Sequence, residues 1–132
     1  SGTGATLAGL SRAITDSQLA IGFSALKGGN FLSDEVTAFL NGSDSATISG
    51  TSSKNWQIEQ GCRFGGYAKI DDELISFMKR FQSQHGFKLD AVYTGKMFYG
   101  LFHHIESGYF KPGTVIVAVH SGGLQGNKGF NL

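Results

Sequence analysis

Two short apolar runs constrain the fold of this chain more than any other feature. One reads QLAIGFSAL over residues 18–26, and the other reads TVIVAVH over residues 114–120. Runs that are apolar almost throughout are typical of strands covered on both faces in a parallel sheet. A third, less regular strand is predicted over residues 56–63, before the turn FGGY. Because parallel strands need crossover connections, the sequence predicts an α/β fold with a mainly parallel sheet flanked by helices.

Four other segments carry apolar residues three and four positions apart, as one buried face of a helix requires. They cover residues 5–14, 33–41, 71–85 and 94–107. Ser33 is expected to cap the second of these helices, and the acids at 71–73 are expected in the first turn of the third. The expected buried stripes are Leu74, Phe77, Met78 and Phe81 in the third helix, and Met97, Leu101 and Ile105 in the fourth. Residues 43–55 are mostly polar or small and are predicted to form a surface loop.

Composition narrows the class of protein. A chain of 132 residues suffices for one modest domain, and a formal charge of +1 offers no basic surface for nucleic acid. Cys62 is the only cysteine, and no secretory signal is visible, so a reducing, cytoplasmic setting is expected. No apolar run is long enough to span a bilayer. His103 and His104 are adjacent in a helix and cannot share a metal in the usual i, i+4 manner, so no metal site is predicted.

The first ten residues, SGTGATLAGL, form a loop of small residues that runs into a helix. Backbone N–H groups at a helix start lack intrahelical partners and coincide with the positive end of the helix dipole, so such a loop can cradle a phosphate. A plain helix start remains the alternative. Phosphate loops normally follow a strand, and none precedes Ser1, so we expect the chain to be part of a longer polypeptide.

Three stretches together resemble one family. SGTGATLAGL, DAVYTGK over residues 90–96 and VHSGGL over residues 119–124 are similar, in order and spacing, to the C-terminal part of pyridoxal-phosphate enzymes of the 1-aminocyclopropane-1-carboxylate deaminase and D-cysteine desulfhydrase family. The resemblance implies the tryptophan synthase β-like fold, called fold type II. Residues 1–132 would then be the C-terminal portion of the large, cofactor-binding domain, without its N-terminal strands and without the small domain.

The resemblance also implies the roles of particular residues. The cofactor phosphate would be held by Gly2, Thr3, Gly4, Ala5 and Thr6. Ser121 would lie beside the pyridine nitrogen, and Thr94 would occupy the position from which deaminases present a glutamate to that nitrogen. Tyr93 and Tyr67 match two tyrosines at the substrate face, where a phenol can orient a carboxylate or pass a proton.

Thr94 and Ser121 form the neutral pair that is typical of the desulfhydrase-like members. We therefore expect β-elimination from D-cysteine, giving pyruvate, ammonia and hydrogen sulfide. One alternative is a 1-aminocyclopropane-1-carboxylate deaminase, which would give 2-oxobutanoate and ammonia. A second is a β-replacing enzyme of the same fold, and a third, of another class, is a non-catalytic module that binds a phosphate or nucleotide.

The Schiff-base lysine of the family lies upstream of the phosphate loop, so the chain alone is expected to be inactive. Lys96 is expected to be a solvated lysine at a helix start rather than a substitute for that lysine. The expected partners are a small amino-acid substrate, the missing N-terminal segment of the same protein and a second copy in a homodimer. Without that segment, the sheet is expected to expose an edge.

Overall fold

A computed structural model describes residues 4–25, 30–41, 55–61, 64–66 and 69–130. Gly2, Thr3, Tyr67 and Cys62 therefore lie outside the described residues, as does most of the loop expected at 43–55. The helices are α1 (Ala5–Ala13), α2 (Asn30–Asn41), α3 (Asp72–His85), α4 (Thr94–Glu106) and a 3-10 helix, η1 (Leu124–Gly129). The strands are β1 (Ala20–Phe23) and β2 (Trp56–Glu59).

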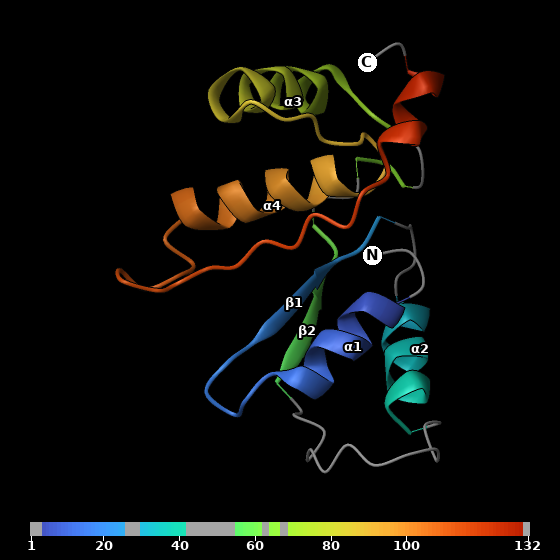
Figure 1. Ribbon diagram of the computed structural model, residues 1–132, viewed down its shortest axis with the longest axis vertical. Helices are drawn as coiled ribbons and strands as arrows, with labels where there is room; N and C mark the ends of the chain where they lie inside the picture. The colour runs from blue at the N-terminus through green and yellow to red at the C-terminus, as the bar shows by residue number, and fades with distance from the viewer. Residues whose placement is uncertain (1–3, 26–29, 42–54, 62–63, 67–68, 131–132) are drawn as a thin grey trace.

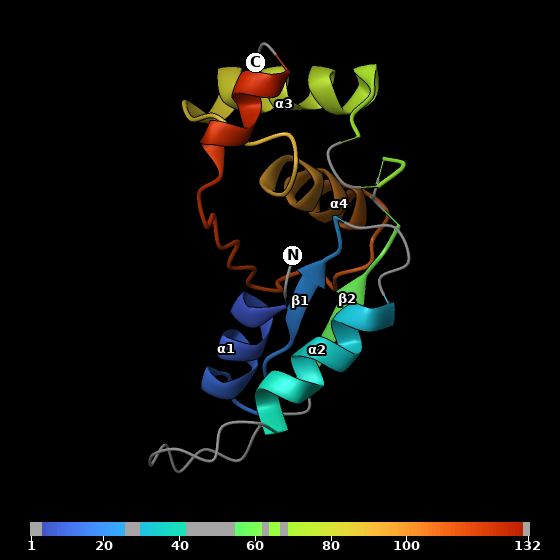
Figure 2. The ribbon, with the colours of Figure 1, turned by 90° about the vertical axis from the view of Figure 1, so that its right-hand side faces the viewer.

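The two strands form a parallel sheet, with Ala20 opposite Trp56 and Phe23 opposite Glu59. This pairing confirms the predicted α/β fold with parallel strands, although both strands are shorter than the segments proposed for them. In Figures 1 and 2, α1 and α2 lie on one face of the sheet, α4 lies above its upper end, and α3 is stacked on α4. Both strands finish at the end of the sheet where α1 begins (Figure 1).

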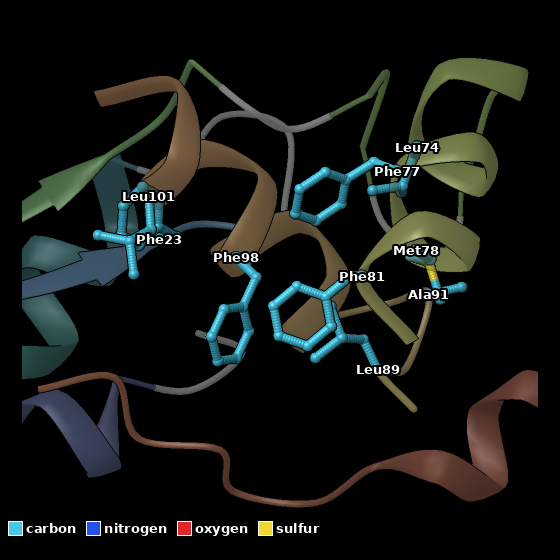
Figure 3. Packing of buried hydrophobic residues seen from close by; sticks show 9 residues of the cluster. All are labelled: Phe23, Leu74, Phe77, Met78, Phe81, Leu89, Ala91, Phe98 and Leu101. Atoms are coloured by element: carbon cyan, nitrogen blue, oxygen red, sulfur yellow. The ribbon is translucent and has the colours of Figure 1, made fainter. Parts of the chain in front are cut away.

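Alternation along β1 divides its residues between two hydrophobic cores. Ala20 packs with Leu7, Ala8 and Val36 in a small core beneath α1 and α2. Phe23 belongs instead to a larger core between the sheet, α3 and α4 (Figure 3). The members of this larger core are Phe23, Leu74, Phe77, Met78, Phe81, Leu89, Ala91, Phe98 and Leu101. Since β1 contributes to both cores, it joins the two halves of the chain.

The helix α3 matches its prediction closely. Asp71 is its N-cap and accepts a hydrogen bond from the Leu74 N–H at 2.9 Å, while Gly86 ends the helix in the left-handed conformation. All four residues of the expected stripe are buried. Acidic residues in the first turn and a glycine after the last turn are the signals that define this helix from sequence.

Two other helices correct the predictions made for them. α2 begins at Asn30, so Ser33 lies inside the helix, where its carbonyl accepts a hydrogen bond from Thr37 Oγ1; the expected cap at Ser33 was wrong. Leu32 lies one helical turn before Val36 and both are 0% exposed, so the buried face of α2 begins before Ser33. In α4, Ile105 is 48% exposed although it was expected in the buried stripe, and Phe98 is buried instead.

The segment Thr114–His120 is not a strand in this chain. It is extended but pairs with no strand among the described residues, and Val115 and Val117 are 88% and 83% exposed. The prediction of a central buried strand was therefore wrong for this chain. The physical reason is that β-branched residues favour a strand only when a neighbouring strand satisfies the backbone and covers the side chains.

Candidate functional site

The start of α1 has the geometry of an anion-binding helix terminus. Gly4 is the N-cap, with φ of 77°, and no side chain caps this end of the helix. A Cβ at Gly4 would lie 2.7 Å from Val36 Cγ2, so both the backbone conformation and the available space require glycine here. Ala5 and Thr6 follow on the exposed side of the first turn. The described part of the predicted phosphate loop thus fits a phosphate group.

The segment 90–96 is organised by the buried carboxylate of Asp90. Oδ1 accepts hydrogen bonds from the N–H groups of Val92 (3.0 Å) and Tyr93 (2.7 Å). Oδ2 accepts from the Thr94 N–H (2.8 Å) and from Thr94 Oγ1 (2.6 Å). Asp90 thereby holds the start of α4, whose N-cap is Tyr93, and fixes the backbone of Tyr93, whose side chain is half-buried.

Gly95 allows this turn to close against α3. A Cβ on Gly95 would lie 2.7 Å from the Asp90 carbonyl oxygen and 2.9 Å from Met78 Sδ. The Gly95 N–H also donates to that carbonyl at 2.7 Å. The glycine of the VYTGK motif is therefore required by packing, independently of any ligand.

The turn Ser121-Gly122-Gly123 lies against the same carboxylate. Gly122 and Gly123 have φ of 95° and 101°, and a Cβ on Gly123 would lie 3.0 Å from Asp90 Oδ2. Asn127 of η1 reinforces the contact, since its Oδ1 accepts from the Ala91 N–H (2.9 Å) and its Nδ2 donates to the Leu89 carbonyl (2.8 Å). The structure therefore brings the DAVYTGK and HSGGL motifs together through Asp90 and Asn127, while Ser121 itself is exposed.

Lys96 is buried, which corrects the expectation of a solvated lysine. Its side chain is 1% exposed, and Nζ donates to the Gly66 carbonyl at 2.6 Å. Burial lowers the pKa of Lys96 below its usual 10.5, although the carboxylates of Asp71 and Asp90 act in the opposite direction. Helical periodicity could not reveal this, because a lysine among small residues in a first turn normally faces solvent.

Sequence reasoning assigned no role to Asp90 or Asn127. Asp90 lies four residues before the first residue of α4, too far upstream to be recognised as an N-cap, which directly precedes its helix. No local pattern marks Asn127, because its partners, Leu89 and Ala91, lie 38 and 36 residues away.

The histidines serve packing contacts in the described structure. The His104 ring is stacked on Tyr109 with centroids 4.4 Å apart, and its Nε2 lies 3.7 Å from Glu59 Oε2. His120 Nδ1 accepts from the Gly122 N–H at 3.2 Å, and its ring lies against Phe87 and Phe98.

Among the described residues, no group of three His, Cys, Asp or Glu side chains could hold a metal ion. No helix in that part of the chain is both long enough and apolar enough to cross a bilayer.

Comparisons with known proteins agree with the three motifs. A Pyrococcus furiosus protein named as a 1-aminocyclopropane-1-carboxylate deaminase is 33% identical over 129 residues, which is 95% of this chain and 38% of that protein. An Arabidopsis thaliana protein, named bifunctional D-cysteine desulfhydrase/1-aminocyclopropane-1-carboxylate deaminase, mitochondrial, is 31% identical over the same share of this chain and 31% of its own length. No family model matches the chain.

Structural comparison gives the same result. A crystal structure of an ACC deaminase homologue superposes with a TM-score of 0.65 and 25% sequence identity, over 82% of this chain and 34% of the homologue. The chain thus spans between three and four tenths of the length of the proteins that it matches. By sequence over nearly its whole length and by fold, it is related to the 1-aminocyclopropane-1-carboxylate deaminase and D-cysteine desulfhydrase family, as its motifs predicted.

Proposed function

We propose that this chain is the C-terminal part of the cofactor-binding domain of a pyridoxal-phosphate-dependent enzyme that eliminates a thiol from a small amino acid. The observation that carries the proposal is the Asp90 carboxylate, which holds the start of α4 and lies against Gly123. Two motifs that are far apart in the sequence are thereby held in contact. The glycine-capped start of α1 supplies a second feature that the cofactor needs, a place for its phosphate.

Each residue of the site has a proposed task. The loop Gly2, Thr3, Gly4, Ala5 and Thr6 binds the phosphate through backbone N–H groups and hydroxyls. Tyr93 and Tyr67 orient the substrate or hold a proton near it. Bound pyridoxal phosphate would supply an electron-accepting ring that stabilises negative charge at the substrate's α carbon.

The hydrogen bonds of Thr94 distinguish its task from that of Ser121. The hydroxyl of Thr94 donates its single proton to Asp90 Oδ2 and accepts a hydrogen bond from the Asp90 N–H at 2.9 Å. It can therefore offer only a lone pair to a ring nitrogen. Ser121 is the residue of the pair that can donate to an unprotonated nitrogen, and an unprotonated ring suits a reaction with a good leaving group.

The expected reaction combines D-cysteine with water to give pyruvate, ammonia and hydrogen sulfide. The bond between the α carbon and its hydrogen breaks, a double bond forms between the α and β carbons as the carbon–sulfur bond breaks, and the sulfur leaves as a thiolate that takes up a proton. Hydrolysis of the unsaturated product then releases the amino group as ammonia and leaves pyruvate. 1-Aminocyclopropane-1-carboxylate is the alternative substrate, with 2-oxobutanoate and ammonia as products, because both activities appear in the name of the Arabidopsis relative.

The test uses the intact gene product in a homodimer, the assembly that we propose. Titration with pyridoxal phosphate should produce the visible absorption band of a lysine-bound cofactor, and D-cysteine should then release hydrogen sulfide. Release of 2-oxobutanoate alone would instead select the deaminase reaction. Binding of a nucleotide without any change in visible absorption would refute the enzyme proposal and support a phosphate-binding module.

A further inference from the structure

The turn Phe64–Gly66 has a backbone that requires support from outside itself. Its three residues have φ of 49°, 86° and 126°, all on the left-handed side of the Ramachandran map. This conformation is unfavourable for Phe64, which carries a side chain. Within the turn region, the Gly66 carbonyl accepts a hydrogen bond from the Lys69 N–H at 3.3 Å.

Helix α4 holds this turn at two points one helical turn apart. Lys96 Nζ donates to the Gly66 carbonyl at 2.6 Å. Three residues further along α4, the Tyr99 ring packs edge-on against Phe64, with ring centroids 4.8 Å apart. Tyr99 is itself fixed to α3 by a hydrogen bond from its hydroxyl to a Glu73 carboxylate oxygen and by an edge contact with Phe77. The turn is therefore attached to the packed α3–α4 pair.

The carboxylates of Asp71 and Asp90, which hold the starts of α3 and α4, both raise the pKa of Lys96, although burial lowers that pKa overall. An almost fully buried ammonium is costly unless it is hydrogen-bonded, and Lys96 Nζ donates to the Gly66 carbonyl. Lys96 thus connects the Phe64–Gly66 turn to α4.

We propose that Lys96 is a positioning residue that fixes the Phe64–Gly66 turn to the start of α4, and with it Tyr93. Tyr93 directly precedes α4 and has its proposed task at the substrate, so this inference rests on the proposed function. Lys96 acts on Tyr93 through the backbone, because its ammonium contacts a main-chain carbonyl in the protein interior.

The test compares three variants of the intact gene product. Lys96→Met removes the ammonium but keeps a long apolar stem, and Phe64→Leu weakens the other attachment of the same turn. Lys79→Met is the matched control, because Lys79 is an exposed lysine of α3. For each variant, the measurements are cofactor affinity, kcat, KM and amide hydrogen exchange in peptides that cover residues 64–70.

Lys96→Met is expected to lower kcat by about 10- to 100-fold, as misplacement of a reacting group does, with cofactor affinity within about twofold of wild type. Exchange in residues 64–70 should become faster, while Lys79→Met should resemble wild type in every measurement. A wild-type kcat, or an equal loss of cofactor affinity, would overturn the proposal. If Lys96→Met does not fold, Phe64→Leu decides: reduced kcat with normal cofactor binding supports the proposal, and wild-type kcat overturns it.

The exchange measurement also separates this inference from the proposed function, because it requires no cofactor. If the wild-type protein neither binds pyridoxal phosphate nor releases hydrogen sulfide, the proposed function fails, and the positioning role for Tyr93 fails with it. If the wild-type protein is active but Lys96→Met changes neither kcat nor exchange, the function stands and the inference alone is refuted.

Discussion

Replacement of Asp90 by asparagine would test the contact that joins the two motifs. Oδ1 can remain an oxygen and keep the N–H groups of Val92 and Tyr93. The new amide NH₂ would then face the Thr94 N–H, so that one buried donor loses its acceptor at a cost of about 1–3 kcal/mol. Asp90→Ala removes the acceptor for all three N–H groups, two of which belong to buried residues, and should cost about 3–5 kcal/mol.

Losses of this size are large beside the ~5–15 kcal/mol that typically stabilises a domain, so Asp90→Asn is the informative variant. Urea denaturation of the intact gene product, followed by far-ultraviolet circular dichroism, measures the loss. Asp16→Asn is the control, because Asp16 is exposed in the loop after α1, and it should change stability by less than about 0.5 kcal/mol. If Asp90→Asn is as stable as this control, the carboxylate does not hold the start of α4 in the way described.

Three further predictions concern separate parts of the chain. Gly4→Ala should destabilise the protein by about 1–3 kcal/mol and weaken pyridoxal phosphate binding in a titration. Gly9→Ala is the control: no atom lies within 4 Å of its new Cβ, and it should stabilise the protein by about 0.5–1 kcal/mol. Equal effects of the two substitutions would contradict the role of Gly4. Because burial lowers the pKa of Lys96, the unfolded state binds more protons than the folded state between the folded pKa and 10.5. The free energy of unfolding of the wild-type protein should therefore rise with pH in that window relative to that of Lys96→Met. If urea denaturation shows the same pH dependence for both proteins from about pH 8 to about pH 10, this prediction is wrong. Val117→Lys should leave the stability of the isolated chain within about 0.5 kcal/mol of wild type. It should also reduce self-association of the isolated chain in sedimentation velocity, and unchanged association would show that this exposed segment does not form the contact between copies.

The parts of the fold that could be predicted from sequence are those specified by neighbouring residues. α3 has an aspartate cap, an acidic first turn, one apolar stripe and a glycine stop, and all of these signals agree. In α4, Phe98 and Ile105 are seven residues apart and therefore lie on nearly the same side of the helix, yet Phe98 is buried and Ile105, in the last turn, is 48% exposed. Periodicity shows which side of a helix faces a partner but not how far along the helix that partner extends, and nothing in the α4 sequence identifies it.

The candidate site shows the same division. Its motifs could be recognised because each occupies a short stretch, but the connections between them are long-range. Lys96 reaches across 30 residues to Gly66, and Asn127 across 38 residues to Leu89. Such contacts depend on the completed fold, so the sequence could indicate which segments form the site without showing what holds them together.

The segment Thr114–His120 has a high propensity for a β-strand but does not form one in this chain. Its residues are suited to a strand, but a strand is stable only in pairs, and β1 and β2 pair with each other. In Figures 1 and 2 the segment runs between α4 and the β1–α1 half without joining the sheet. If the remainder of the protein supplies a neighbouring strand, Val117 becomes buried there. Val117→Lys should then destabilise the intact protein by several kcal/mol while remaining neutral in the isolated chain, and a neutral effect in both would mean that the segment is never a buried strand.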